Sequence, residues 1–200
     1  MGLTPIRTTI AGAIPVFQKV IELFKGGFHL NRPVGFVDGI DLPAGTLLKV
    51  DESTRVAIPI KVAVTTQTAA SDTAIYVETG HPFVASDIIA VNGHSTAGKI
   101  ISVKTTTASG DKIAVNTVFT TTSSCTGERT VYHTATAGTT LTLHTIPNGI
   151  LAYDSTLSTG EEASVLLRGT VYKNRANPLQ PHLIDAHFAG LDHIYVSESS

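Results

Sequence analysis

Beyond residue 32, short apolar runs alternate with turn-forming residues along most of the chain. Examples are GTLLKVD and RVAIPIKVAV within 33–64, and SDIIAVNG, GKIISVKTTT and DKIAVNTVFTT farther on. These runs are rich in Val, Ile and Thr, and Gly, Asp, Asn or Ser bound them. Regular short strands with such turns are typical of small antiparallel barrels and sandwiches. The pattern therefore predicts a mainly β fold built from small antiparallel barrel or sandwich units.

Two segments differ from this strand pattern, and we expect each to form a short helix. In PVFQKVIELFKGG, residues 15–27, Pro15 suits the first helical position and Gly26 suits the end. Apolar residues fall at helical spacing in this segment: Val16, Phe17, Val20, Ile21 and Phe24. A helix this short needs a partner surface to be stable. The second segment is HLIDAHFAGL, residues 182–191, which precedes a last strand, HIYVS.

The change of texture along the chain predicts an insertion. A polar segment, TTQTAASDTAI, separates an early set of predicted strands from a second set. From about residue 139 onward, the sequence pattern again resembles that of the early set. Pro59 lies inside the run RVAIPIKVAV, and it should make that run an edge strand or a bulge. The expected parts are an arm with a short helix (1–32), the first part of a β core (33–64), an inserted small β unit (65–138) and the second part of the core (139–200).

Composition narrows the choice of partners. Charged residues make up 15% of the chain, the formal net charge is −2 and the pI is about 6.4. This balance argues against a general nucleic-acid binder, which needs a basic face to displace counterions. The N-terminus has no signal-peptide pattern, and no apolar run approaches the ~18 residues that span a membrane. We expect a soluble protein made inside a cell, with no nucleic-acid or membrane partner, whose weakly charged, Thr-rich surface suits an assembly.

The stretch DIIAVNGHSTAGKI resembles two catalytic motifs and departs from both. Residues 93–97 match the nucleophile elbow G-x-S-x-G around Ser95, with Ala97 where the second Gly should be. Residues 93–100 resemble a phosphate-binding loop, with Ile100 where Ser or Thr should hold Mg²⁺. Both motifs need a helix after the turn, but KIISVKTTT is β-branched and favours a strand. We therefore expect a Gly-rich hairpin turn here.

The other reactive side chains form no constellation in the sequence. Three histidines near the C-terminus are spaced by five and six residues: His182, His187 and His193. Two metal ligands on one helix face lie three or four residues apart, so this spacing does not favour a metal site. The acid pairs at 51–52 and 161–162 are sequence neighbours, and glycoside hydrolysis needs two carboxylates that face each other across a substrate. Cys125 lies in a loop-like segment, SSCTG, and forms no intrachain disulfide because it is the sole cysteine. We expect no enzyme activity, no metal site and no cofactor.

The segment EEASVLLRGTVYKNR, residues 161–175, is a strand that ends in a basic, polar stretch. Arg168 stands beside Gly169 in its apolar part, so its charge lies either at an exposed end or opposite an acid at an interface. We interpret this strand and its basic end as part of a surface that contacts a partner. The residues that we expect to make that contact are Val16, Phe17, Val20, Ile21, Phe24, Arg168, Lys173 and Arg175.

Four segments together resemble the head decoration proteins of tailed bacteriophages. They are LPAGTLLK at 42–49, GILAYD at 149–154, ASVLLRGTV at 163–171 and LDHIY at 191–195. The chain departs from that family's pattern where residues 170–173 intervene before Asn174. The expected insertion at 65–138 is also extra, and it is similar to the small barrels of phage head-fibre and auxiliary capsid proteins.

The resemblance implies a β-rich structural protein that binds the outer surface of an assembled shell. Its partner would be the phage major capsid protein, and it would form a homo-oligomer, with a trimer favoured. It would be made in the host cytoplasm and would be located on the outer surface of the virion. The arm at 1–32 would be the tether to the shell. One alternative is a head-fibre or adhesin module that binds a receptor or glycan, although aromatic residues are 6% of the chain and Trp is absent. The other is a small hydrolase that uses Ser95.

Overall fold

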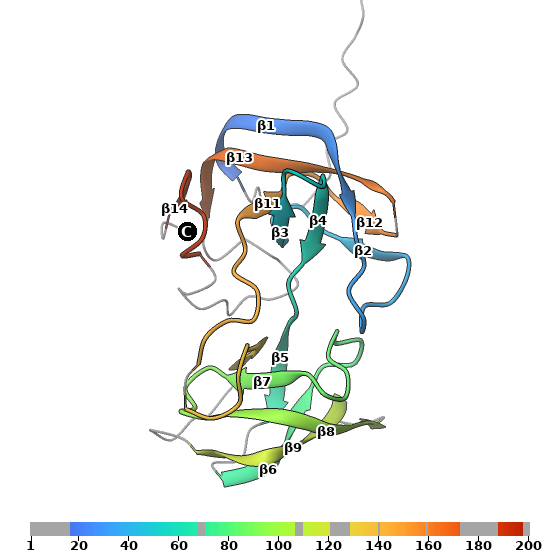
Figure 1. Ribbon diagram of the computed structural model, residues 1–200, viewed down its shortest axis with the longest axis vertical. Helices are drawn as coiled ribbons and strands as arrows, with labels where there is room; N and C mark the ends of the chain where they lie inside the picture. The colour runs from blue at the N-terminus through green and yellow to red at the C-terminus, as the bar shows by residue number, and fades with distance from the viewer. Residues whose placement is uncertain are drawn as a thin grey trace, which may run out of the picture.

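The computed structural model describes residues 17–67, 71–106, 110–120, 129–139, 141–158, 160–172 and 188–197. All regular elements within these ranges are strands, and they form two small barrels that lie end to end (Figure 1). The expected mainly β fold is therefore confirmed.

The first barrel combines strands from both ends of the chain. Its sheet has the order β1-β4-β3-β11-β13-β14, and an additional β1–β13 pairing joins β1, β4, β3, β11 and β13 into a ring. A two-stranded sheet of β2 and β12 accompanies it. The strands are β1 (Phe17–Leu30), β2 (Ile40–Leu42), β3 (Leu47–Asp51), β4 (Val56–Pro59), β11 (Gly149–Leu151), β12 (Ser155–Leu157), β13 (Glu162–Tyr172) and β14 (Ile194–Ser197).

The second barrel comes from the middle of the chain. Its strands close in the order β10-β5-β6-β9-β8-β7, because β10 pairs with β7 as well as with β5. The strands are β5 (Val62–Gln67), β6 (Ser71–Val77), β7 (Ile88–Val91), β8 (Ala97–Thr106), β9 (Gly110–Thr120) and β10 (Arg129–His133).

Each barrel has its own apolar interior. In the first, Phe28, Leu48 and Val165 belong to one fully or almost fully buried cluster, and Leu47 and Leu166 belong to a second. In the second barrel, the buried residues are Ile75, Val77, Ile89, Val91, Ile113, Val115 and Val131, among others. These are the apolar positions of the short β-branched runs, so burial of one strand face drives both closures.

The prediction of a helix at 15–27 is wrong, because the described part of that segment, from Phe17 onward, belongs to β1. β1 pairs antiparallel with β13 from Phe17, opposite Val171, to His29, opposite Glu162. An isolated helix of this length is marginal in water, whereas the β13 partner satisfies a whole strand edge. At the end of β1, Phe28 enters the first core with no exposed surface. The glycine pair at 26–27 is also unfavourable inside a helix.

The C-terminal helix expected at 182–191 is not found either, where the segment is described. Residues 182–187 lie outside the described residues. The following residues form a turn that the Leu191 N–H closes by donating to the Phe188 carbonyl at 3.1 Å. Leu191 then packs into the second cluster of the first barrel, beside β14.

Pro59 does not make a bulge within one strand; it ends a strand. β4 stops at Pro59, and β5 begins at Val62 in the other barrel, so Ile60 and Lys61 cross between the two barrels (Figure 1). A proline carries no N–H for a further ladder bond, which suits a point where the chain leaves one sheet.

The hairpin expected around residues 93–98 is confirmed. β7 and β8 pair antiparallel, with Ile88 opposite Lys99 and Ala90 opposite Ala97. Gly93 has a φ of 88°, in the left-handed region that a tight turn uses. Ser95 is followed by β8, so the helix that a nucleophile elbow or a phosphate-binding loop requires is replaced by a strand.

Candidate functional site

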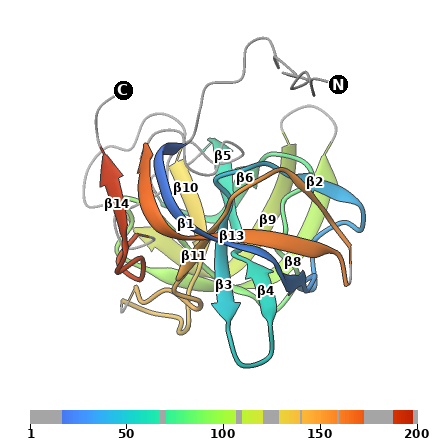
Figure 2. The same ribbon diagram turned by 90° about the horizontal axis from the view of Figure 1, so that it is seen from above.

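β1 and β13 cross the end of the molecule that lies opposite the second barrel (Figures 1 and 2). The register places Lys19 opposite Thr170, and Thr170 opposite Tyr195 of β14, so these three side chains share one side of the sheet. Farther along the same ladder, after Val20 and Gly169, Glu22 and Arg168 are cross-strand neighbours. We call the exposed residues of this end the β1 face: Lys19, Val20, Ile21, Glu22, Arg168 and Tyr195.

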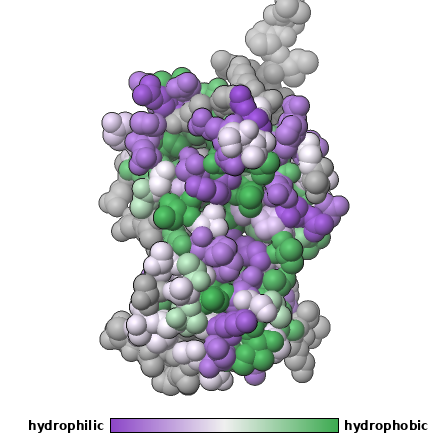
Figure 3. All heavy atoms as spheres, in the orientation of Figure 1, coloured by the Kyte–Doolittle hydropathy of each residue, from purple (hydrophilic) through white to green (hydrophobic). Residues whose placement is uncertain are grey.

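Three large apolar side chains are exposed on the β1 face. Ile21 is 60% exposed, Val20 is 46% exposed and Tyr195 is 77% exposed. Elsewhere, on the side shown in Figure 3, hydrophilic and hydrophobic residues are intermingled over both barrels. Apolar groups next to an opposite-charge pair are typical of a surface that a partner covers.

The structure places some of the predicted contact residues on this face and others elsewhere. Val20, Ile21 and Arg168 lie on the β1 face. Phe17 is partly buried and packs against the first barrel's core, and the backbone of Phe24 pairs with Val165. Val16, Lys173, Arg175 and the side chain of Phe24 lie outside the described residues.

A cavity of about 430 Å³ opens beside Arg168. Three carboxylates, those of Glu22, Glu52 and Asp192, share its lining with the single guanidinium of Arg168. No described carboxylate lies within ion-pair distance of that guanidinium. Acids therefore exceed bases around the cavity, which favours a partner surface of opposite sign.

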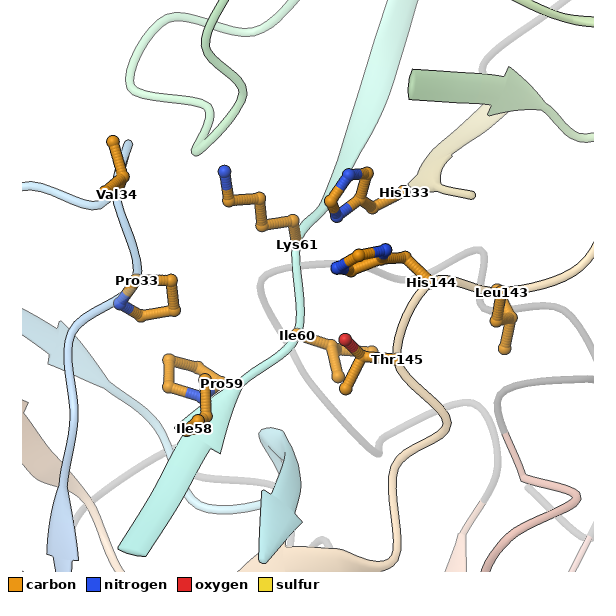
Figure 4. Close-up of a pocket in the computed structure, with 10 residues that line it drawn as sticks. All are labelled: Pro33, Val34, Ile58, Pro59, Ile60, Lys61, His133, Leu143, His144 and Thr145. Atoms are coloured by element: carbon orange, nitrogen blue, oxygen red, sulfur yellow. The ribbon is translucent and has the colours of Figure 1, made fainter. Parts of the chain in front are cut away.

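A second candidate is a crevice of about 300 Å³ where the chain crosses between the barrels (Figure 4). One wall is apolar and comes from Pro33, Val34 and Pro59, whereas Lys61 and two histidine rings approach from the other side. The full lining is Pro33, Val34, Ile58, Pro59, Ile60, Lys61, His133, Leu143, His144 and Thr145.

A buried ion pair borders this crevice. Lys61 Nζ donates to Asp87 Oδ2 at 2.8 Å, and the two side chains are only 10% and 13% exposed. The Val84 N–H donates to the same carboxylate oxygen at 3.0 Å. Since Lys61 lies on the crossing and Asp87 immediately precedes β7, the pair ties the crossing to the second barrel. Removing one partner would leave a buried charge uncompensated.

Two neighbouring histidine rings, tilted by 34° relative to each other, complete the cluster. The ring centroids of His133 and His144 are 4.1 Å apart, and His133 Nε2 lies 3.8 Å from Asp87 Oδ1. Burial lowers the pKa of His133 to about 4; Asp87 opposes this shift, while His144 and Lys61 add to it. A group with this pKa is neutral at pH 7 and is a poor general base there. The cluster is therefore suited to joining the barrels rather than to proton transfer.

A similar pair lies in the second barrel, between the segment that follows β6 and the first residues of β9. His81 Nε2 lies 3.5 Å from Asp111 Oδ2, and the Phe83 N–H donates to His81 Nδ1 at 3.1 Å. Burial lowers the pKa of His81, and Asp111 opposes the shift. Because Nδ1 accepts a hydrogen bond, we assign the proton of the neutral ring to Nε2, toward the carboxylate. Sequence analysis missed both histidine–aspartate pairs, since whole strands separate their members in the chain.

The described part of the chain holds no group of three or more His, Cys, Asp or Glu side chains arranged to bind a metal ion. Among the same residues, no helix has the length and apolar character needed to cross a bilayer. Comparisons with protein families, with characterised proteins and with solved structures found no match to this chain.

Proposed function

We propose that this protein is an auxiliary capsid protein that binds the outer surface of an assembled bacteriophage shell through its β1 face. The observation that carries the proposal is the position of that face. Exposed Val20, Ile21 and Tyr195 lie beside the Glu22–Arg168 pair at one end of the molecule, and the second barrel lies at the other end (Figure 1). A molecule built this way can sit on a surface with one barrel and project the other.

The sheet order of the first barrel supports the proposal. The four segments that resemble head decoration proteins are neighbours there, because β3 pairs with β11, β11 with β13, and β13 with β14. Polar contacts also join the first two segments: Asp154 Oδ1 accepts the Ala44 N–H at 2.7 Å, and the Gly45 N–H donates to the Leu151 carbonyl at 2.8 Å.

The proposed function is mechanical and uses binding energy alone. A protein that binds the expanded shell better than the unexpanded shell stabilises the expanded form by mass action. Each contact can be modest when several copies in one oligomer bind together. The major capsid protein is the proposed partner, a homo-oligomer with three copies is the favoured state, and the outer surface of the virion is the proposed location.

The structure changes how the arm is assigned to the shell contact. Residues 17–30 belong to β1 and complete the first barrel, so they are not a detachable tether. A truncation that is meant to test the arm should therefore stop at residue 16. Deletion through residue 27 would remove most of β1 and expose the first core.

The test is co-sedimentation with assembled shells. Replacing Ile21 by Asp puts a charge into the proposed contact and should weaken shell binding at least tenfold, about 1.4 kcal/mol or more. The matched control is Ile101→Asp on β8, because Ile101 is 63% exposed on the second barrel. Equal shell binding by the two variants, at unchanged melting temperatures, would show that the β1 face is not the contact.

A head-fibre or adhesin function is the second candidate, and β8 is the observation that favours it. Ile101 and Val103 are both exposed on this strand of the second barrel. If the second barrel binds a receptor or glycan, Ile101→Asp should reduce the adsorption of virions to host cells. Virions that carry the Ile21→Asp protein should adsorb normally. The same two variants therefore separate the two functions.

A further inference from the structure

β1 has one edge that no described strand covers. It pairs with β13 on one side along most of its length, and on the other side it meets β4 only at His29 and Leu30. Among the described residues, no strand pairs with that second side between Phe17 and Gly27. An open edge presents unpaired N–H and C=O groups and is a template for a further strand.

The residues of this edge also suit a further strand. Val20 and Ile21 are exposed, and both are β-branched residues that favour sheet contacts. The β1–β13 ladder is irregular between Phe17 and Lys19 and between Val20 and Glu22. Such bulges disfavour a long, uniform pairing of β1 with another β1. The edge is therefore better suited to a short added strand than to a second β1.

The N-terminal segment of this chain has the right composition for that edge. Residues 6–14, IRTTIAGAI, lie between Pro5 and Pro15, contain no proline and are rich in β-branched residues. Arg7 is their one charged residue. It complements the acids that exceed bases beside the β1 face, where Glu22, Glu52 and Asp192 surround Arg168.

Chain connectivity favours a segment from another copy. A two-residue turn at 15–16 would need a positive φ, which Pro15 does not adopt. A turn at Gly12–Ala13 would place residues 6–11 opposite residues 14–19 and would leave the β1 edge beyond residue 19 unpaired. A longer loop over residues 13–16 would bring the chain's own arm back to the edge, and the disulfide trap described below separates that outcome from exchange. A segment from another molecule needs no turn and can run along the whole edge.

We propose that residues 6–14 of a second copy add as a strand to the open edge of β1, so that the protein forms an arm-exchanged homo-oligomer. Each copy then donates one arm and accepts one. Such a head-to-tail contact closes into a ring when the rotation between copies allows it. This inference goes beyond the proposed function, because it concerns the isolated protein and requires no shell.

The first test is the mass of the purified protein in solution, measured by sedimentation velocity at tens of micromolar. The full chain should have a mass of at least twice the 21.0 kDa of one chain, and deletion of residues 2–16 should give a monomer. Ile10→Pro removes a backbone donor in the middle of the proposed strand and should also give a monomer. The matched control is Thr4→Pro, which lies outside the proposed strand and should leave the oligomer intact.

A disulfide trap then identifies the donor. In a Cys125→Ser background, Ile10→Cys combined with Ile21→Cys should give oxidised species of two or more chains on denaturing gels. A cross-link only within one chain would overturn the exchange, and so would a full chain that is monomeric. If the deletion variant does not fold, as judged by circular dichroism, the comparison of Ile10→Pro with Thr4→Pro decides. Equal masses for those two variants would refute the proposal.

Discussion

The two barrels are closed in different ways. The second is sealed by the β10–β7 ladder, which runs without irregularity over Val131, Tyr132 and His133. The first is closed by the long β1–β13 ribbon, whose register shifts at four places. Within the second barrel, each irregular ladder has one shift. The difference shows where a further strand can be added: the second barrel pairs each of its described strands on both sides, whereas the first leaves part of one edge of β1 unpaired.

The largest expected effect separates the stabilities of the two barrels. Phe28 is fully buried in the first barrel and Ile113 in the second. Phe28→Ala should lower the free energy of unfolding by about 3–5 kcal/mol, because it leaves a large cavity, and Ile113→Ala by about 2–5 kcal/mol. Hydrogen exchange followed by mass spectrometry should show lost protection in β3, β11 and β13 for the first variant, and in β6–β9 for the second. Loss of protection in both barrels for both variants would show that they unfold as one unit.

The same comparison explains which parts of the fold were predictable. The β8–β9 region and the turn at Gly93 have a local signal, since β-branched runs and turn residues alternate there. In β1, bulges at Phe17/Lys19 and Val20/Glu22 break the two-residue alternation of a strand. Apolar residues then fall three and four apart, and this spacing imitates a helix. A bulge depends on the partner strand, so the sequence of β1 alone does not reveal it.

The candidate sites divide in the same way. Local sequence predicts a contact surface that includes Val20, Ile21 and Arg168; all three are exposed at the β1 face, and their contact with a partner stays a prediction. The cluster of Lys61, Asp87 and His133 was missed. Its members come from a crossing, the start of β7 and β10, and only the closed ladder of the second barrel brings them together.

The next effect concerns pH and the crevice between the barrels. The pKa of His133 is about 4 in the folded protein and near 6.5 in an unfolded chain, so the unfolded state binds more protons between these values. Stability should therefore fall as the pH is lowered from about 6.5 to about 4, and this site should account for about 2 kcal/mol between pH 7 and pH 5. The lowered pKa of His81 acts in the same direction.

Urea unfolding at pH 7 and pH 5 measures this effect. His133→Gln should reduce the difference in unfolding free energy between the two pH values, because glutamine does not titrate. His193→Gln, at an exposed position on the first barrel, is the matched control and should leave that difference unchanged. An equal pH dependence for wild type and His133→Gln would show that other groups cause it.

The smallest expected effect tests whether the β1 face is a contact or part of the fold. Arg168 is exposed, and its cross-strand neighbour is Glu22. An exposed pair of this kind contributes about 0.2–1 kcal/mol, so Arg168→Ala should lower the stability of the isolated protein by no more than that. Shell binding should suffer more, because a charge that a partner covers loses its solvent and needs its counterpart. Differential scanning calorimetry and shell co-sedimentation of Arg168→Ala and Arg129→Ala, the latter in the second barrel, measure the two effects separately. If Arg168→Ala lowers the free energy of unfolding by more than it lowers the free energy of shell binding, Arg168 is a structural residue of the β1–β13 closure. The shell contact would then lie in another part of the molecule.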